Sequence, residues 1–168
     1  MTDGNVADAF LSTNDLPLNE IGRAQSARVR VAFAEMVFDR CLLSPARRCM
    51  ETREIVAPSL PFETRTELRE IDFGDWEGRT KAWLEANDPE GIEARRRDPV
   101  SFRPPRGESF LDVADRLRAL ASVIRSDSRA TLIVGHRGTL GVLERLLRDF
   151  PIDSRDVTPL EPGEYRVI

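Results

Sequence analysis

The segment TLIVG at residues 131–135 constrains the fold of this chain more than any other stretch. It is a continuous apolar run bounded by turn-forming residues, which is typical of a strand buried on both faces of a parallel sheet. A helix rich in leucine follows it directly, with Leu140, Leu143, Leu146 and Leu147. A buried strand that leads at once into a helix favours an α/β fold.

Helical patterns alternate with strand patterns along the rest of the chain. Three of the predicted helices begin at a capping residue, and one of these ends before a proline. The predicted helices are 19–36, capped by Asn19; 45–56, capped by Ser44 with Pro45 in the first turn and ended by Pro58; two short pieces within 79–97; a long amphipathic helix from Glu108 or Ser109; and the leucine-rich helix after residue 135. Residues 1–18 are expected to be irregular.

Strands are predicted in DRCLLS (39–44), FETRTEL (62–68), TLIVG and, at the end of the chain, YRVI. This order predicts an α/β sheet flanked by helices, in a single domain over residues 1–168. A parallel sheet covered on both faces needs several central strands, yet the first 30 residues provide none. We therefore expect the first central strand to be missing from this sequence.

Composition excludes several classes of partner. There are 25 Lys and Arg against 29 Asp and Glu, so the net charge of −4 offers no net basic field for nucleic acid or an anionic membrane. No apolar run approaches the ~20 residues of a membrane span, and the first residues lack the basic-then-apolar order of a signal peptide, so we expect neither. Cys41 and Cys49, with a single histidine, make no plausible zinc site, and they indicate packing residues in a reducing cytoplasm. A cytoplasmic protein without a metal or cofactor is expected.

Polar groups follow three of these predicted strands. At the first junction the helix that begins after Ser44 offers free N–H groups and the guanidinium of Arg48, both suited to a phosphate. At the second, Glu70 is flanked by Phe73 and Trp76, whose apolar bulk would raise its pKa and suit it to general acid catalysis.

The third junction holds His136, the only histidine, with Arg137 and Gly138 opening the next helix. Ligand sites gather at the carboxyl ends of parallel strands. We therefore expect the three junctions to form one oxyanion pocket. Taken singly, each residue has a structural alternative: Arg48 as a surface residue, Glu70 as a turn cap, and His136 as a buried structural side chain.

Five motifs, in order along nearly the whole chain, resemble those of the histidine phosphatase superfamily, also called phosphoglycerate mutase-like. They are DLPLNEIGRAQ (15–25), LLSPARRCMET (42–52), LREIDFGDWEG (68–78), RGES (106–109) and VGHRG (134–138). The resemblance implies a three-layer sheet flanked by helices. It also implies transfer of a phosphoryl group onto a histidine.

The resemblance implies a role for several residues, matched by position. His136 corresponds to a second histidine that hydrogen-bonds the phosphoryl oxygens, favoured in its doubly protonated form by a neighbouring phosphate, and Arg48 to an arginine that contacts the same oxygens. Glu70 corresponds to the acid that protonates the leaving oxygen and then activates water. Thr2 and Asn5 correspond to polar residues that follow the nucleophile.

The beginning of the chain departs from the family pattern. The nucleophilic histidine of the family stands in Arg-His-Gly-x-Thr at the end of the first strand, whereas this chain begins MTDGN, with Met1 at the position of x. We expect the nucleophile and the first strand to lie in residues that precede Met1. An in-frame Arg-His-Gly upstream of the Met1 codon would test this expectation.

The implied activity is that of a phosphomonoesterase acting on a small phosphorylated metabolite through a phosphohistidine intermediate. Alpha-ribazole phosphate is one candidate substrate, and the segment 79–106 would overhang the pocket and select among such substrates. A phosphoglycerate mutase is less expected, since the stretch between Trp76 and Gly107 is too short to exclude water. The alternatives are a phosphate-binding pseudoenzyme that lacks the nucleophile and a structural domain without a ligand. A homodimer is possible.

Overall fold

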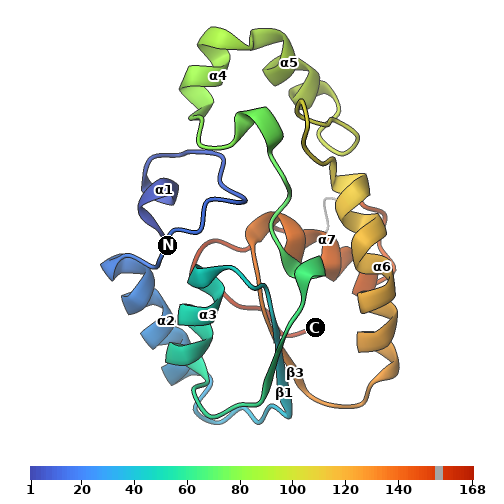
Figure 1. Cartoon of the computed structure of the whole chain (residues 1–168). Helices are drawn as coiled ribbons and strands as arrows, with labels where there is room; N and C mark the ends of the chain where they lie inside the picture. Colours follow the sequence, from blue (N-terminus) through green and yellow to red (C-terminus); the bar gives the residue numbers. More distant parts are fainter. Residues whose placement is uncertain (154–156) are drawn as a thin grey trace.

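A short parallel sheet lies at the centre of the computed structural model, which describes residues 1–153 and 157–168 (Figure 1). Its strands are β1 (Arg40–Leu43), β2 (Phe62–Thr64) and β3 (Thr131–Val134), in the order β2-β1-β3. The helices are α1 (Asp3–Val6), α2 (Glu20–Ala32), α3 (Arg47–Val56), α4 (Lys81–Asn87), α5 (Pro89–Arg97), α6 (Phe110–Ser126) and α7 (Arg137–Leu147), with 3₁₀ turns η1 (Thr66–Leu68) and η2 (Gly74–Trp76). The predicted α/β class is confirmed.

The two faces of the sheet carry separate hydrophobic clusters because successive side chains of a strand point to opposite sides. Leu42 packs with Leu117 of α6 and Leu143 of α7. Cys41 and Leu43 pack on the other face, toward α2 and α3. In Figure 1, α2 and α3 lie to the left of the sheet and α6 to the right. The result is the predicted three layers, helices, sheet and helices.

A third hydrophobic cluster lies apart from the sheet, under α4 and α5. Trp76, Leu84 and Ile92 are buried there, and Phe10 and Phe73 pack against them. The pair α4 and α5 forms the top of the molecule in Figure 1, beyond the carboxyl ends of the strands. These two helices confirm the predicted helical pieces within 79–97.

Only β1 is a fully flanked strand in the described chain. Its alternate backbone groups bond to its two neighbours: Cys41 N–H donates to Pro61 O at 2.8 Å, and Ser44 N–H donates to Val134 O at 3.0 Å. Because N–H and C=O of one residue point to the same side of a parallel strand, Ile133 presents its backbone groups to the outer edge of β3. Within the described residues no strand pairs with that edge.

Two predicted strands differ from the structure. FETRTEL forms a strand only over Phe62–Thr64 and then turns through η1, which lets Leu68 enter the core with no exposed surface. YRVI forms no strand. Its Tyr165 ring packs edge-on against Phe33, with ring centroids 4.8 Å apart, and Arg166 pairs with Glu144 at 2.5 Å.

Two helix boundaries and one additional helix also differ from the prediction. The helix expected to reach Met36 ends at Ala32, because the chain turns so that Phe33 packs against Phe38. The next helix is capped at Ala46, two residues after Ser44. A short helix, α1, lies within the stretch expected to be irregular. The caps at Asn19 and Ser109 are confirmed.

No helix of the described chain combines the length and the apolar character that crossing a membrane requires. The assignment of residues 1–168 to a single domain stays a prediction.

Candidate active site

Arg48 and His136 are in contact at the carboxyl ends of β1 and β3. Arg48 lies in the first turn of α3, and its Nε donates to Nδ1 of His136 at 3.3 Å. His136 follows β3 directly and occupies the N-cap position of α7. The parallel pairing of β1 with β3 brings these two junctions together although they are 88 residues apart.

The hydrogen bonds of His136 indicate which ring nitrogen carries the proton. Because Arg48 donates to Nδ1, the ring proton is assigned to Nε2, which lies 2.8 Å from Ser44 Oγ. Burial, followed by the guanidinium groups of Arg48 and Arg116, lowers the pKa of His136 to about 3. The imidazole is therefore neutral without a ligand. A bound phosphate would oppose the two guanidinium charges and raise this pKa.

The carboxyl group of Glu70 lies against the first turn of α7. Its oxygens accept from the N–H groups of Ile71 at 3.0 Å, Gly138 at 3.3 Å and Thr139 at 3.1 Å, and from the Thr139 hydroxyl at 3.2 Å. Burial raises the pKa of Glu70, against the opposite effect of these donors. The predicted direction is confirmed, but the surroundings are the α7 turn, whereas Trp76 belongs to the cluster under α4 and α5.

A loop crosses above Arg48 and binds its guanidinium. Nη1 donates to Asn14 O at 3.1 Å and Nη2 to Ser12 O at 3.3 Å. The carboxylate of Glu77 holds this loop from the other side, because it accepts from Ser12 N at 2.8 Å, Ser12 Oγ at 2.5 Å and Asn14 N at 3.0 Å. Glu77 thus fixes the carbonyl groups that orient Arg48.

One cavity of about 540 Å³ brings most of the predicted site residues together. Those that line it are Thr2, Asn5, Arg48, Glu70, His136 and Arg137. Gly138 is not among the lining residues. A Cβ there would lie 2.8 Å from Glu70 Oε1, so this glycine allows Glu70 to approach α7.

The cavity continues from this cluster along β3. Its walls there are Leu132–Gly135 on one side and the inner face of α2 on the other, with Gly22, Gln25, Ser26 and Val29, followed by Phe33 at the end of the helix. Residues 160–165 form a further wall. Met1 also lines the cavity, and its amino group donates to Gln25 Oε1 at 3.1 Å. The hollow therefore separates α2 from the outer edge of the sheet.

Three of the residues predicted to bind phosphate have partners of their own. Thr2 donates through its N–H and its hydroxyl to Asn5 Oδ1, at 2.8 and 2.9 Å, which caps α1. Arg137 is exposed and pairs with Glu161 at 3.0 Å. Phosphate binding by Thr2, Asn5, Arg137 and Gly138 stays a prediction, as do the roles of Arg48, Glu70 and His136.

Sequence reasoning missed three residues that organise the cluster. Ser44 was assigned to a helix cap, yet its hydroxyl contacts His136. Glu77 lies inside the FGDWEG motif, which was a signal for its importance but not for its partner. Arg116 contacts the segment that carries Glu70, and no sequence signal distinguishes it from the other arginines of α6. Among the described residues, no group of His, Cys, Asp and Glu side chains is arranged to hold a metal ion.

Comparison with known proteins identifies the class. The model of the histidine phosphatase superfamily (branch 1) matches residues 1–168. The chain is 32% identical over 171 residues to the adenosylcobalamin/alpha-ribazole phosphatase of Salmonella typhimurium, covering 99% of this chain and 85% of that protein. It is 32% identical over 167 residues to the glucosyl-3-phosphoglycerate phosphatase of Mycobacterium tuberculosis, covering 90% and 73%.

Solved structures agree with this assignment. The alpha-ribazole phosphatase of Shigella flexneri has a TM-score of 0.86 at 29% identity, covering 97% of this chain and 83% of that one. A mycobacterial glucosyl-3-phosphoglycerate phosphatase in complex with VO3 has a TM-score of 0.81 at 31% identity, covering 90% and 79%. The chain belongs to the histidine phosphatase superfamily, a family of enzymes. These relatives are phosphatases named for alpha-ribazole and for glucosyl-3-phosphoglycerate.

Proposed function

We propose that this protein hydrolyses the phosphate ester of a small metabolite through a phosphohistidine intermediate. The observation that carries the proposal is the contact between Arg48 and His136 beside the buried carboxyl of Glu70, all lining one cavity. A guanidinium and an imidazole N–H are donors suited to the oxygens of a phosphoryl group. A carboxyl with a raised pKa retains the proton that a leaving alcohol needs.

The reaction has two steps in this proposal. A histidine nucleophile attacks phosphorus, the bond to the leaving oxygen breaks, and Glu70 gives that oxygen its proton. Arg48 and His136 stabilise the phosphoryl oxygens during the transfer. In the second step Glu70, now a carboxylate, takes a proton from water as the water attacks the phosphohistidine. Histidine, inorganic phosphate and protonated Glu70 are then regained.

His136 is not the nucleophile in this proposal. It is the only histidine of the chain, it is only 7% exposed, and both ring nitrogens already have partners in Arg48 and Ser44. These contacts suit an oxyanion donor. In this proposal the nucleophile comes from residues outside the 168.

We place the nucleophile on a strand that fills the hollow beside β3. The backbone groups of Ile133 face that side without a pairing strand among the described residues, and small residues of α2, Gly22 and Ser26, line the opposite wall. A parallel strand there would end at the level of His136. A segment joined to Met1, which itself lines the cavity, would enter it directly.

The substrate class follows from the relatives and from the position of α4 and α5. The names of the relatives support a phosphomonoester on a small organic group, and alpha-ribazole phosphate is the first candidate. The segment 79–106, which contains both helices, would contact the leaving group. A phosphoglycerate mutase is disfavoured, because the short segment would admit water. The cytoplasmic location and the homodimer stay predictions.

A second candidate is a phosphate-binding protein without turnover. It is favoured by one observation, the absence from the 168 residues of any histidine other than the engaged His136. The two candidates share the contact between Arg48 and His136. They differ only in the supply of a nucleophile.

The deciding experiment compares the 168-residue chain with a chain extended through the in-frame codons upstream of Met1. We expect both to bind vanadate and only the extended chain to hydrolyse p-nitrophenyl phosphate. Robust turnover by the 168-residue chain, or an upstream frame without Arg-His-Gly, would refute the proposed nucleophile. Failure of both chains to turn over, with vanadate still bound, would favour the second candidate.

Substitutions in the extended chain test the oxyanion donors. Arg48→Ala and His136→Ala should each lose about 2 to 4 kcal/mol of transition-state stabilisation. The loss is measured as a fall in kcat/KM. Arg47→Ala is the matched control, since Arg47 is the preceding residue, is exposed and pairs with Glu51 at 2.8 Å. A reduction of less than about tenfold at Arg48 or His136 would remove that residue from the mechanism.

A further inference from the structure

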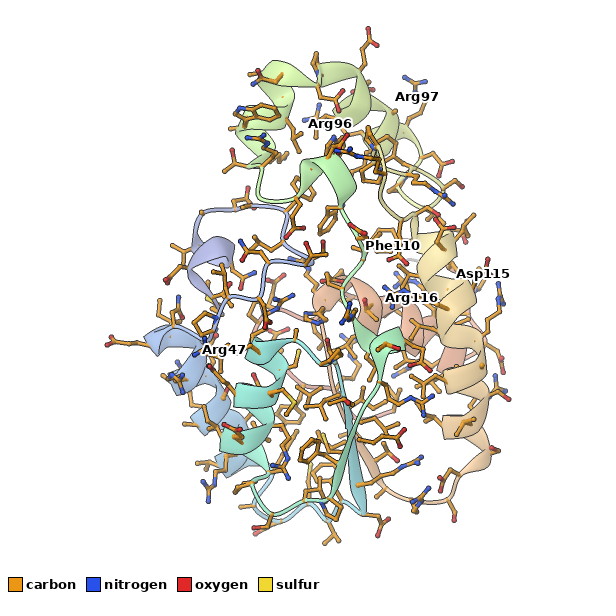
Figure 2. The ribbon with its side chains drawn as sticks, in the orientation of Figure 1. Arg47, Arg96, Arg97, Phe110, Asp115 and Arg116 are labelled. Atoms are coloured by element: carbon orange, nitrogen blue, oxygen red, sulfur yellow. The ribbon has the colours of Figure 1, made fainter. Side chains whose placement is uncertain are left out.

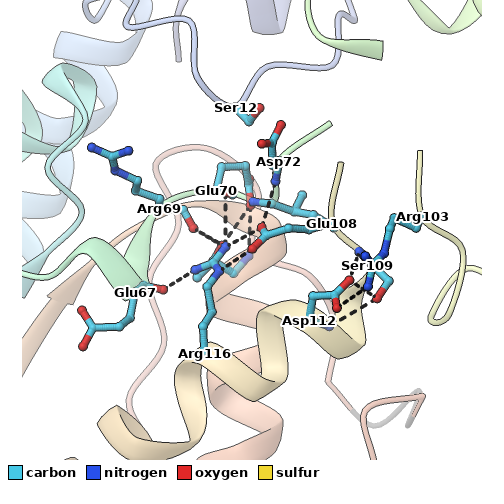
Figure 3. A network of polar contacts seen from close by, with 12 residues as sticks. Ser12, Glu67, Arg69, Glu70, Asp72, Arg103, Glu108, Ser109, Asp112 and Arg116 are labelled. Carbon is cyan, nitrogen blue, oxygen red and sulfur yellow. Dashed lines mark hydrogen bonds and ion pairs between the residues drawn. The ribbon is translucent and has the colours of Figure 1, made fainter. Parts of the chain in front are cut away.

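The RGES motif (106–109) takes no part in the phosphoryl-binding cluster, yet it is joined to the segment that carries Glu70. Glu108 Oε2 accepts from Asp72 N–H at 3.0 Å, and Glu108 N–H donates to Asp72 O at 2.8 Å. The same carboxylate pairs with Arg116 of α6, whose Nε lies 3.1 Å from Glu108 Oε1. Figure 3 shows this network, with Arg116 between Glu108 and the Glu70 segment.

The guanidinium of Arg116 donates to three backbone carbonyl groups between residues 67 and 70 as well as to Glu108. Nη2 donates to Arg69 O at 3.0 Å and to Glu70 O at 3.3 Å, and Nη1 donates to Glu67 O. Figure 2 shows Arg116 pointing from α6 toward the centre of the molecule, whereas the preceding Asp115 points outward. One planar cation therefore collects the carbonyls on either side of Glu70.

This segment has no regular structure to hold it in place. Residues 69–73 lie between η1 and η2 and belong to no helix or strand. From the opposite side, the Thr139 hydroxyl of α7 donates to Arg69 O at 2.6 Å. The backbone at Glu70 is thus held between Arg116 of α6 and Thr139 of α7.

We infer that Arg116, supported by Glu108, is a positioning residue that keeps the Glu70 carboxyl aligned for proton transfer. The inference rests on the proposed role of Glu70. Among the described contacts, Arg116 donates only to backbone carbonyls and to Glu108, so its hydrogen bonds act through the Glu70 segment. Its charge also lowers the pKa of His136, and Arg116→Lys keeps that charge. A lysine would keep the charge but would lack the rigid fork that reaches several acceptors at once.

The test follows the amide groups of Gly138 and Thr139, which donate to Glu70 and report its position without any need for turnover. In Arg116→Lys we expect their proton resonances to move in the same direction as in Glu70→Gln, and their hydrogen exchange to accelerate by about tenfold. Arg118→Lys is the matched control, because Arg118 lies on the same helix, is exposed and pairs with Asp115.

Glu108→Gln is the second variant, in case Arg116→Lys fails to fold. It keeps the shape of the side chain and removes the charge that holds Arg116. Activity is measured in the form of the chain that hydrolyses phosphate esters. There, Arg116→Lys or Glu108→Gln, if folded, should lose about tenfold or more in kcat with little change in KM, because a small displacement of an acid weakens chemistry more than binding.

The outcomes separate this inference from the proposed function. If the folded variants leave the amides of Gly138 and Thr139 as in the wild type, Arg116 is only structural and the inference is overturned. If Glu70→Gln keeps full kcat, the proposed role of Glu70 is wrong, and Arg116 then has no role in catalysis through Glu70. The inference about Arg116 is supported if Arg116→Lys both displaces the amides of Gly138 and Thr139 and loses kcat, and Arg118→Lys does neither.

Discussion

At the scale of single residues, His136 and Glu70 are buried groups whose pKa values move in opposite directions. Burial and Arg48 lower the pKa of His136, so the folded state binds its proton less readily than the unfolded state does. Burial raises the pKa of Glu70, so the folded state holds that proton more readily. Acidification therefore destabilises the fold through His136 and stabilises it through Glu70.

The contribution of His136 can be isolated by substitution. Between its unfolded value near 6.5 and its folded value of about 3, the unfolded chain binds one more proton at this position. The stability advantage of the wild type over His136→Gln should thus shrink as the pH falls below about 6.5, by up to about 1.4 kcal/mol per pH unit. Denaturant unfolding of both proteins at pH 7, 6, 5 and 4 measures it, and parallel curves would contradict it.

Much of the site was predictable from the ends of strands. Arg48 and His136 were correctly brought together because parallel strands end at one edge of a sheet. The burial of Glu70 was anticipated, but not its place against α7, which depends on how a segment without regular structure is held. Ser44 was predicted only in part, because its hydroxyl accepts from Ala46 N–H at the start of α3 but also contacts His136, 92 residues away.

At the scale of elements, the loop that contains Ser12 and Asn14 lies between two side chains. Its N–H groups donate to Glu77, just after η2, and its carbonyl groups accept from Arg48 of α3. Glu77→Gln keeps the shape of the side chain but removes the charge that accepts from three donors of this loop. Hydrogen bonds to charged groups contribute about 1.5 to 3 kcal/mol each. A loosened loop would hold the Arg48 guanidinium less firmly, because its carbonyl groups accept from that side chain. We therefore expect vanadate affinity to fall by about tenfold.

Isothermal titration of the 168-residue chain with vanadate measures this effect. Glu85→Gln is the control, since Glu85 is exposed and pairs only with Arg96 at 2.6 Å among the described contacts. Equal affinity in Glu77→Gln and the wild type would show that the loop does not orient Arg48.

Elements with strong periodicity were predicted well, and those decided by distant contacts were not. The capped amphipathic helix α6 and the apolar strand β3 form as expected. YRVI has the composition of a strand, but it pairs with neither edge of the described sheet, and its tyrosine packs on Phe33 instead. A local pattern cannot reveal whether a segment will pair with a strand or pack through its side chains.

At the scale of the whole molecule, the outer edge of β3 is where the strand that we propose to precede Met1 would pair. The N–H of Ile133 faces that edge, whereas Leu132 and Val134 face β1. Amide exchange at Ile133 should be fast in the 168-residue chain and at least about tenfold slower in the extended chain. Leu132 and Val134 serve as internal controls. Equal exchange at Ile133 in both chains would contradict a strand in the hollow.

The pairing of β1 with β3 joins residues 40–43 to residues 131–134. Contacts between segments so distant in sequence form slowly, since a long stretch of chain must close before they stabilise anything. During synthesis on the ribosome, β1 and β2 would emerge well before the strand that completes their ladder. We therefore expect the apolar residues of β1 to stay exposed to solvent until most of the chain has been made. Chaperone binding at that stage would protect them from aggregation.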